Sequence, residues 1–508
     1  MKYLHEPNPG TVILDHRLTP EVRAMLAAMV SRSPVGGMKQ RYAEVVETAG
    51  GEDALTTYPL PPKVQTFFDQ FVGQYGHSSV MELTGSPTVA VEGVSWFTAW
   101  VLFDSPLVAG QEFSTRAVRY KDWPMARESH FEDPLATSIL QAEDERILRS
   151  LGGYDIDPTG FASPTVTAPH PDLVLLHQGW LEVFEAEVAW WQQHLADPAN
   201  RAALNIGDKE PFRPALDRAR WALPGTFTTG AAFASNVRER ARAIRDAQSV
   251  NKTPTPVWAN IESAYQAASP GIAKYGLKEA VVGVERNLPG HLASILEPVS
   301  GVLDGVEVTL RICDWNPVEG VQPYARTRDL SYADPWFNRQ MRVRLRIECS
   351  LAVARDWHRH RTLYPWHLGV VVTDGEISLD RRYGPKSDLA IERTPKLLRR
   401  SRDLYKKFME LGDKERAALA LPMGTKVVVS GAGGLRDVLY ALELRATAHG
   451  ANFEYQQQAV SAMWDLERAT RLQFVPDVDQ YFERSVFEAV GFSPSGKPLY
   501  DYLHPRKG

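Results

Sequence analysis

The chain has 508 residues, of which 44% are hydrophobic and 23% charged, and this composition excludes an intrinsically disordered or collagen-like protein. Lysine and arginine number 57 against 62 acidic residues, so the net charge of −5 provides no overall basic surface for nucleic acid. At about 100 to 200 residues per domain, we expect two to four domains, or two large ones.

The first ten residues lack the apolar segment of a secretory signal, and no stretch reaches the roughly 18 apolar residues of a membrane span. We therefore expect a cytoplasmic protein without a membrane anchor. Cys313 and Cys349 cannot form a disulfide framework and lack the spacing of a zinc site, which suits a reducing compartment. We interpret both cysteines as packing residues and predict no metal site.

Apolar residues spaced by three and four predict helices, whereas alternation of apolar and polar residues with many β-branched side chains predicts strands. In chain order we predict a helix over 19–30, a strand over 88–94, a helix over 239–247, strands over 306–312 and 341–348, a helix over 349–361, a strand over 368–379 and a helix over 435–449. Strands followed by helices, twice over, indicate an α+β fold.

Two pairs of similar segments indicate an internal repeat. Residues 89–95 resemble residues 345–351 at an offset of about 256, and residues 219–224 resemble 419–422 at about 198. The offset shrinks between the two pairs, which an insertion in the first copy explains.

We place that insertion at about 121–210, among acidic, proline-rich and tryptophan-rich segments. The stretch that ends near residue 270 is rich in proline, threonine, serine and glycine, so we place the boundary there. The prediction is two divergent α/β repeats, residues 1–270 and 271–508, that form an internal pseudo-dimer. The alternative is two unrelated α+β domains that share short apolar patterns.

The strongest local signal lies at the end of the predicted 349–361 helix, in the sequence Trp357-His358-Arg359-His360-Arg361. The helix dipole favours cations at this end, and neighbouring arginines can bind phosphate or carboxylate oxygens. An imidazole can also lie against an aromatic ring system. A solvated basic helix end is the alternative interpretation. A metal site at His358 and His360 is not expected, because residues two apart on a helix point to different faces.

Residues 353–361, VARDWHRHR, resemble the arginine-histidine-arginine signature helix of the flavin-dependent thymidylate synthases, the ThyX family. Four further stretches resemble motifs of that family and occur in the family's order. They are GHSSVME at 76–82, EFSTR at 112–116, Asn236-x-Arg238, and LRATAH at 444–449 followed by EYQ at 454–456.

The resemblance implies ThyX-like repeats, an FAD cofactor, and methylenetetrahydrofolate and NADPH as co-substrates for methylation of a uracil nucleotide at carbon 5. The cofactor-binding residues that it implies are His77, Ser79, Glu112, Asn236, Arg238, Arg359, His360 and Arg361. The substrate-binding residues that it implies are Ser114, Arg116, Asp356, Arg445 and His449, and the catalytic ones are Ser114, Arg359 and Arg445.

The motifs are divided between the two halves. The first half has Phe103-Asp104-Ser105-Pro106 where the signature would stand, and the second half has residues 363–369 where the serine-x-arginine loop would stand. In the family, each site combines the signature helix of one subunit with that loop of another. The resemblance therefore implies one composite site per chain, and a homodimer that forms a pseudo-tetramer of repeats.

Several residues depart from the family's pattern. Asp356 stands where the family has glutamine, and Gly230 and Val428 stand where it has a phosphate-binding arginine. The alternatives are therefore a different uridine nucleotide as substrate, a catalytically inactive nucleotide-binding or scaffold protein, and an enzyme that modifies nucleic acid.

Two other stretches invite a functional interpretation. Residues 393–407 are dense in lysine and arginine, which indicates a solvated helix face or, alternatively, a contact with a polyanion. Residues 428–434, VVSGAGG, look like a dinucleotide-binding turn, but the last glycine of that motif would fall at Arg436. We therefore do not predict a dinucleotide-binding turn there.

Overall fold

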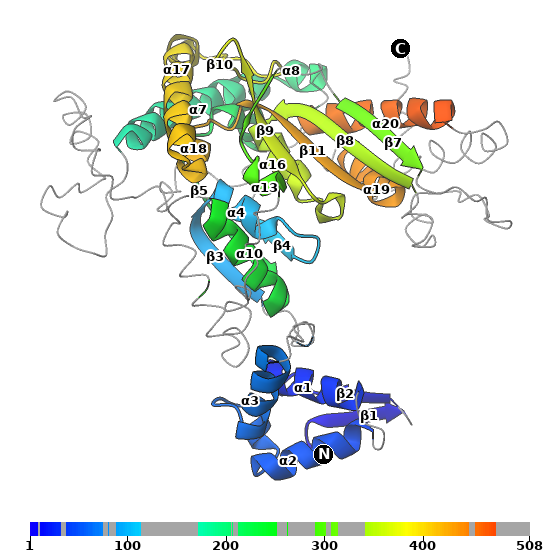
Figure 1. Cartoon of the computed structure of the whole chain (residues 1–508). Coiled ribbons are helices and arrows are strands. Elements are labelled where there is room, and N and C mark those ends of the chain that lie inside the picture. The colour runs from blue at the N-terminus through cyan, green and yellow to red at the C-terminus, as the bar shows by residue number, and fades with distance from the viewer. Residues whose placement is uncertain are drawn as a thin grey trace, which may run out of the picture. The chain divides into compact units, whose positions relative to one another are not determined.

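The computed structural model describes residues 1–8, 11–31, 37–74, 80, 88–112, 171–204, 206, 212–250, 262, 290–300, 306–312, 341–446 and 453–473. The chain divides into two compact units (Figure 1). Unit 1 comprises Met1–Glu92, Leu107–Glu112 and Gly230–Leu288, and unit 2 comprises Gly93–Pro106, Phe113–Thr229 and Pro289–Gly508. The predicted repeat boundary near residue 270 lies outside the described residues and stays a prediction.

The N-terminal part of unit 1 is a small cluster of helices with a β-hairpin. Strands β1 (Leu4–Asn8) and β2 (Thr11–Leu14) pair antiparallel and precede α1 (Pro20–Ser31), α2 (Met38–Ala49), η1 (Asp53–Leu55), α3 (Pro62–Phe68) and η2 (Asp69–Gln74). Its core includes Val22, Met25, Tyr42, Leu55 and Phe68, each at most 1% exposed. The predicted helix over 19–30 is confirmed as α1.

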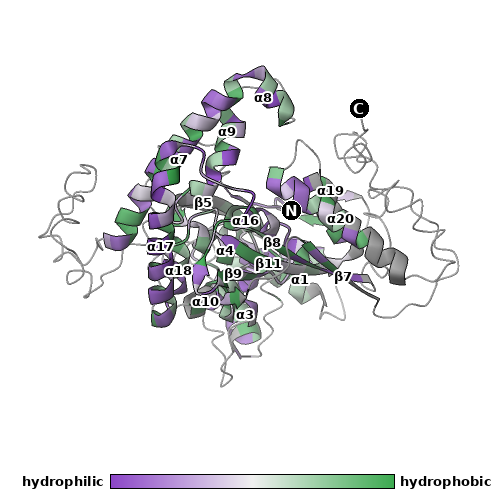
Figure 2. Cartoon of the chain, turned by 90° about the horizontal axis from the view of Figure 1, so that it is seen from above, coloured by the Kyte–Doolittle hydropathy of each residue, from purple (hydrophilic) through white to green (hydrophobic). Residues whose placement is uncertain are grey.

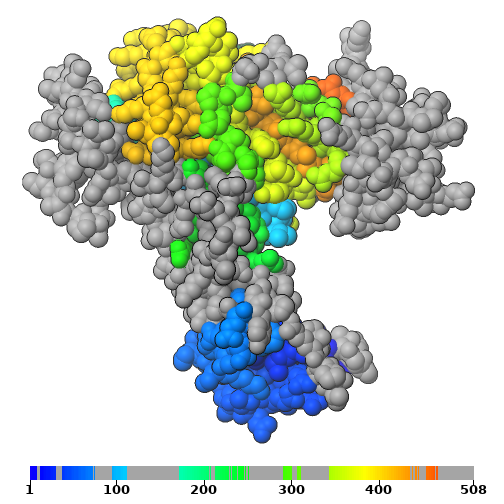
Figure 3. All heavy atoms as spheres, viewed as in Figure 1, coloured from blue at the N-terminus to red at the C-terminus, as the bar shows by residue number. Residues whose placement is uncertain are grey.

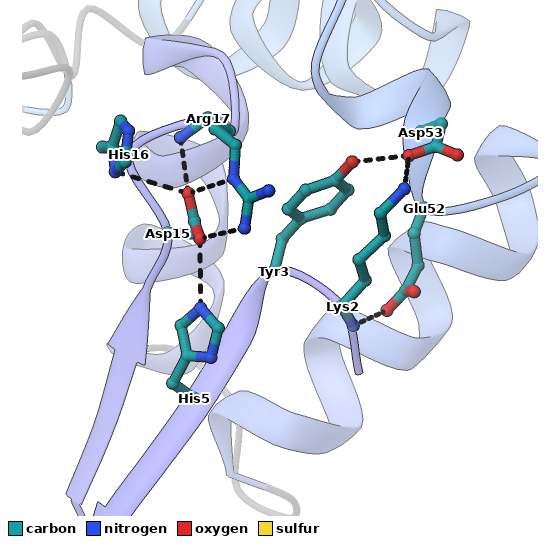
Figure 4. A network of polar contacts seen from close by, with 8 residues as sticks. All are labelled: Lys2, Tyr3, His5, Asp15, His16, Arg17, Glu52 and Asp53. Carbon is teal, nitrogen blue, oxygen red and sulfur yellow. Dashed lines mark hydrogen bonds and ion pairs between the residues drawn. The ribbon is translucent and has the colours of Figure 1, made fainter.

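Polar contacts hold the two ends of this hairpin (Figure 4). Asp15 accepts hydrogen bonds from Arg17 Nε at 3.0 Å and Nη2 at 2.7 Å, and its Oδ2 lies 3.0 Å from His5 Nε2. The hydrogen bonds from Arg17 hold the pKa of Asp15 far below its usual range. Asp53 accepts from Lys2 Nζ at 2.7 Å, which ties the start of the chain to η1.

Unit 1 also contains most of a three-stranded sheet in the order β3 (Thr88–Ser95), β5 (Thr228–Ala234), β4 (Ala109–Glu112), followed by α10 (Val237–Val250). The strand predicted over 88–94 and the helix predicted over 239–247 are thus confirmed. Arg240 is fully buried at the start of α10. Its Nε donates to Ser235 Oγ at 3.1 Å and its guanidinium lies 3.9 Å from the Phe233 ring centroid.

The centre of unit 2 is a six-stranded sheet in the order β10-β9-β11-β8-β7, with β6 beside β9. Its strands are β6 (Pro298–Ser300), β7 (Val306–Ile312), β8 (Met341–Ser350), β9 (His367–Thr373), β10 (Glu376–Ile377) and β11 (Lys426–Gly434). Every pairing is antiparallel except β6 with β9. The strands predicted over 306–312 and 341–348 are confirmed.

Strand β8 shows the alternation that predicted it. Val343, Leu345 and Ile347 are fully buried, whereas Arg342 and Arg344 on the opposite face are exposed. Cys349, on the buried face, is also fully buried, and burial raises the pKa of its thiol. The packing role predicted for Cys349 is confirmed, while Cys313 lies outside the described residues.

The segment predicted as a single strand over 368–379 is two strands, β9 and β10. They are joined by Asp374 and Gly375, whose φ angles of 52° and 78° lie in the left-handed region. An aspartate followed by a glycine tolerates this conformation and forms a tight hairpin turn. The prediction of β structure was right, and the turn within it was missed.

The helices of unit 2 come from both halves of the chain. They are α4 (Trp96–Phe103), α7 (Pro171–Ala196), α8 (Pro198–Ala203), α9 (Phe212–Ala219), η7 (Arg220–Ala222), α13 (Gly290–Ala293), α16 (Leu351–His358), η8 (Arg361–Leu363), α17 (Asp388–Leu411), α18 (Lys414–Leu419), α19 (Leu435–Ala446) and α20 (Phe453–Gln473). Helices and strands together confirm the mixed α+β content. In the described part of the chain, no helix combines the length and apolar character needed to cross a bilayer.

Helices α7 and α17 pack against each other. Trp180 Nε1 donates to Ser401 Oγ at 3.1 Å, and a Cβ atom on Gly179 would approach Leu397 Cδ2 to 2.5 Å. Helix α17 carries many hydrophilic residues (Figure 2) and forms part of the face drawn in Figure 3, where it is yellow to orange. It contains most of the basic stretch 393–407. Arg400 of that stretch pairs with Asp172 of α7 at 3.0 Å.

Two of the segments that indicated the repeat contain serines that cap helices. Ser95 caps α4 by accepting from Thr98 N, and Ser350 caps α16 by accepting from Val353 N. These serines are 255 positions apart, close to the expected offset of about 256. The two leucine-proline segments also meet, because the backbone N–H of Met423 donates to the Leu223 carbonyl at 2.9 Å.

The closeness of these two segments predicts a strong effect of Gly225→Ala. A Cβ atom there would lie 2.1 Å from the Leu421 carbonyl oxygen, so backbone must move. We expect the change to lower the free energy of unfolding by about 1–3 kcal/mol. Differential scanning calorimetry would detect this as a lower midpoint temperature of unfolding. Gly384→Ala is the control, since nothing lies within 4 Å of its Cβ position. Equal midpoints for the two variants would contradict this packing.

Candidate active site at the end of helix α16

Helix α16 begins directly where β8 ends. Ser350 Oγ accepts from Val353 N at 3.3 Å and donates to Glu454 Oε2 at 2.6 Å, so the cap is itself held by α20. The backbone N–H of Leu351 donates to the Thr425 carbonyl at 2.9 Å. All eight residues of α16 are buried. The sequence predicted this helix over 349–361, but the helix ends at His358, with Arg359 as its C-cap.

The carboxylate of Asp356 joins two arginines. Arg220 Nη1 donates to Asp356 Oδ2 at 3.0 Å, and Arg359 Nη2 donates to Oδ1. Arg220 is 1% exposed and Asp356 is 7% exposed, so both charges are removed from water. Burial lowers the pKa of Arg220, but the charges of Asp356, Tyr383, Asp217 and Glu454 together outweigh burial, and the pKa is raised overall. Each oxygen of the Asp356 carboxylate thus accepts a hydrogen bond from a guanidinium group.

His360 follows the helix and lies beside Arg445 of α19. Arg445 Nε donates to His360 Nε2 at 3.1 Å, so this ring nitrogen acts as an acceptor. Burial, together with the charges of Arg445 and Arg359, lowers the pKa of His360 to about 3. The Arg445 guanidinium also lies 5.1 Å from the Tyr455 ring centroid. The site thus combines a neutral imidazole with two guanidinium groups.

The pKa of His360 predicts how this site titrates. Because the folded value of about 3 lies below the ordinary value of 6.5, His360 stays neutral in the folded protein at pH 5–8. Its contribution to stability is present above pH 6.5 and is lost toward pH 3, by at most about 1.4 kcal/mol per pH unit. In NMR spectra, the imidazole proton resonance of His360 is identified as the one that disappears in the His360→Gln variant. We expect its chemical shift to stay constant between pH 8 and pH 5. A titration midpoint near pH 6 would contradict the buried environment of His360.

Two glycines of β11 let η8 lie close to the sheet. A Cβ atom on Gly431 would lie 2.6 Å from the Leu363 carbonyl oxygen, and one on Gly433 would lie 3.1 Å from the Thr362 carbonyl oxygen. The glycine-rich sequence 428–434 belongs to β11, a central strand of the sheet. Its glycines make room for the segment that begins with the exposed Arg361.

The other histidine of the signature, His358, faces a different neighbour. Its ring stacks on Trp100 with centroids 3.8 Å apart, and its Nε2 lies 3.6 Å from Asp104 Oδ1. Asp104 Oδ2 lies 2.6 Å from His291 Nε2. Burial raises the pKa of Asp104, but His291 and His358 outweigh burial and lower it overall. As the spacing predicted, His358 and His360 do not converge on one site.

The structure brings together five of the predicted site residues in unit 2: Asp356, Arg359, His360, Arg361 and Arg445. Three others, Glu112, Asn236 and Arg238, lie in unit 1. There, Asn236 Oδ1 accepts from Glu239 N at 2.8 Å and so caps the start of α10. His77, Ser79, Ser114, Arg116 and His449 lie outside the described residues, and their roles stay predictions.

Sequence reasoning missed the role of Arg220, the contact of Tyr455 with Asp356 and the pairing of Asp104 with His291. Arg220 stands in the segment 219–224, which served only as a marker of the repeat. Its position between alanine and tryptophan in an apolar segment was a signal, because a charge in such a segment needs a buried partner. Tyr455 OH donates to the Asp356 carbonyl at 3.2 Å and supports the same turn. No local pattern indicated that contact.

Residues 338–470 match the model of a protein family described as Thy1, thymidylate synthase complementing protein. The match contains the whole α16 signature and Arg445, so the predicted resemblance to the ThyX family is confirmed for this segment. No curated protein sequence matches the chain.

Solved structures of a UMP/dUMP methylase, PolB from Streptomyces cacaoi, also resemble part of the chain. The complex with 5-Br UMP is 16% identical with a TM-score of 0.22, and the match covers 38% of this chain and 98% of that one. The complex with 5-Br dUMP is 17% identical with a TM-score of 0.21, and the match covers 37% and 98%. PolB is thus matched over almost its whole length, and this chain over less than half.

Proposed function

We propose that this chain is an enzyme that methylates carbon 5 of a uracil nucleotide, with a bound flavin and methylenetetrahydrofolate as carbon donor. The observation that carries the proposal is the meeting of Arg359, His360 and Arg445 at the end of α16. These residues lie inside the segment that matches the thymidylate synthase complementing protein family. An alternative substrate is another uridine nucleotide.

The chemistry of the residues at the end of α16 suits FAD. Arg359 and Arg361 offer guanidinium groups that can form paired hydrogen bonds with phosphate oxygens. His360 is neutral, so it can lie against an aromatic ring system without adding charge. We propose that these three residues hold the cofactor, with Asn236 and Arg238 contributing as the family resemblance implies. When bound, the flavin supplies reducing equivalents.

Arg445 is the residue that we propose to stabilise the pyrimidine. Its bond to His360 and its position at the Tyr455 ring fix the guanidinium before any ligand arrives. A cation fixed in this way stabilises negative charge that develops on the pyrimidine during the reaction. Ser114 and Arg116 would hold the nucleotide phosphate, and Asp356 would act through its bond to Arg359.

We propose that the chain is a tandem repeat with one composite site. The equivalent cap serines Ser95 and Ser350 and the contact of Leu223 with Met423 support an internal pseudo-dimer. The first-half position equivalent to the signature holds Asp104, which is buried against His291. Two such chains would form a homodimer that resembles a tetramer of repeats.

An activity assay with purified protein tests the proposal. Given FAD, NADPH and methylenetetrahydrofolate, we expect uridine or deoxyuridine monophosphate to gain a methyl group at carbon 5, detected by mass spectrometry. Arg116→Ala should weaken nucleotide binding by roughly 10- to 100-fold, the loss of one charge-assisted contact, and leave flavin affinity unchanged. Equal loss of both affinities would contradict the role of Arg116.

Two outcomes would favour the alternatives. Nucleotide binding without turnover would indicate a catalytically inactive nucleotide-binding or scaffold protein. Activity only on a polynucleotide would indicate a nucleic-acid-modifying enzyme, for which the basic stretch on α17 is the relevant feature. Arg393, Arg400 and Arg402 of that stretch already pair with Glu182, Asp172 and Glu376, so part of its charge is neutralised within the chain.

A further inference from the structure

Arg220 is a buried charge near the candidate site, with 1% of its surface exposed. It lies on η7 in the first half of the chain, while its partner Asp356 lies on α16 in the second half. Its Nε and Nη2 atoms have no hydrogen-bond partner among the residues that the structure describes. Its Nε lies 3.9 Å from Asp217, too far for a hydrogen bond. A buried cation with one strong partner is costly, so its position calls for a reason beyond packing.

The backbone around Arg220 leaves this side chain little freedom to move. The Trp221 carbonyl accepts from Gly424 N at 2.6 Å, and the Leu223 carbonyl accepts from Met423 N at 2.9 Å. The same loop also holds the start of α16, because the Met423 carbonyl accepts from Ala352 N at 2.8 Å. One loop of the second half therefore holds both the segment of Arg220 and the helix of Asp356.

The charges around Asp356 indicate what Arg220 does. Asp356 accepts from Arg220 on one oxygen and from Arg359 on the other, so one negative charge lies between two positive ones. Without Arg220, the Asp356 charge would cancel that of Arg359. Arg220 compensates the Asp356 charge from the other carboxylate oxygen, and Asp217 lies 3.9 Å from Arg220 Nε. His360 adds no charge because it is neutral. A guanidinium whose charge is not cancelled by its neighbouring carboxylate is what an anionic phosphate requires at the end of α16.

We infer that Arg220 is a positioning residue of the candidate site, supplied by the first half of the chain. It neutralises Asp356 and holds that carboxylate where it orients the Arg359 guanidinium, so that Arg359 keeps a charge that can bind a phosphate group of the cofactor. This inference rests on the proposed function. It also accounts for a fully buried arginine that no sequence motif marked.

A double-mutant cycle on the full chain tests the inference, with FAD affinity measured by isothermal titration calorimetry. Arg220→Met should weaken FAD binding at least about tenfold, because it leaves the Asp356 charge uncompensated next to Arg359. In the Asp356→Asn background, the same Arg220→Met change should alter FAD affinity less than about twofold, since no charge remains to be neutralised. Arg220→Lys should retain most of the wild-type affinity.

Arg416→Met is the matched control, because Arg416 also pairs with a carboxylate in unit 2, Asp413, with Nε to Oδ2 at 2.5 Å. It should lower the thermal unfolding midpoint without changing FAD affinity, as a purely structural arginine would. Equal loss of affinity from Arg220→Met in both backgrounds would overturn the inference and leave the proposed function standing. A wild-type protein that binds no FAD would refute the proposed function. In that case, the same double-mutant cycle, with the affinity for inorganic pyrophosphate measured instead, would decide the role of Arg220.

Discussion

Replacement of His360 and Arg361 by alanine is expected to abolish flavin retention while the protein stays folded. Arg361 is exposed at the first residue of η8, and His360 contacts Arg445 just before it. The change removes one charged donor and one ring contact from the proposed phosphate and flavin site. Because a hydrogen bond to a charged group contributes about 1.5–3 kcal/mol, affinity should fall by roughly 100-fold or more.

The measurement is the visible flavin absorption of the purified protein, followed by FAD titration calorimetry. The control is Lys396→Ala with Arg399→Ala, which removes two exposed cations from α17. The control should retain flavin as the wild type does, and both variants should keep a cooperative thermal transition. A colourless wild-type protein without FAD affinity would refute the proposed function.

Titration with FAD is expected to saturate at one cofactor per chain. Counting from the cap serines Ser95 and Ser350, the first half has Asp104, Ser105 and Pro106 where the second has the signature residues. Asp104 is 4% exposed and engaged by histidines, so its carboxylate would repel an anion rather than bind it. Proline offers no backbone N–H group to a phosphate. The first-half position therefore lacks the groups that the second-half position offers.

The double variant His360→Ala, Arg361→Ala provides a second test of the number of cofactors per chain. If each chain has one site, the variant should lose all of its bound flavin. Saturation of the wild type at two cofactors per chain, or retention of half the flavin by the variant, would contradict the composite-site proposal. It would also indicate that the Asp104 cluster opens in solution, which a structure of the loaded protein would reveal.

The amino-acid sequence was enough to predict the local elements and the position of the signature. The alternation over 341–348 and the three- and four-residue spacing over 349–361 are properties of consecutive residues, so they predicted β8 and α16 without knowledge of their neighbours. The ThyX-like motifs likewise placed Arg359, His360 and Arg445 in one site.

Which buried charges meet depends on the packing of segments that are far apart in the sequence. Arg220 reaches Asp356 across 136 positions of the chain, and Asp104 reaches His291 across 187. Periodicity describes which face of an element is apolar, but not which distant segment packs on it. A buried charge is stable only beside a partner, and that partner is set by the packing of whole segments. The neutralisation of Asp356 by Arg220 and the pairing of Asp104 with His291 therefore require the two halves of the chain to be folded together in unit 2.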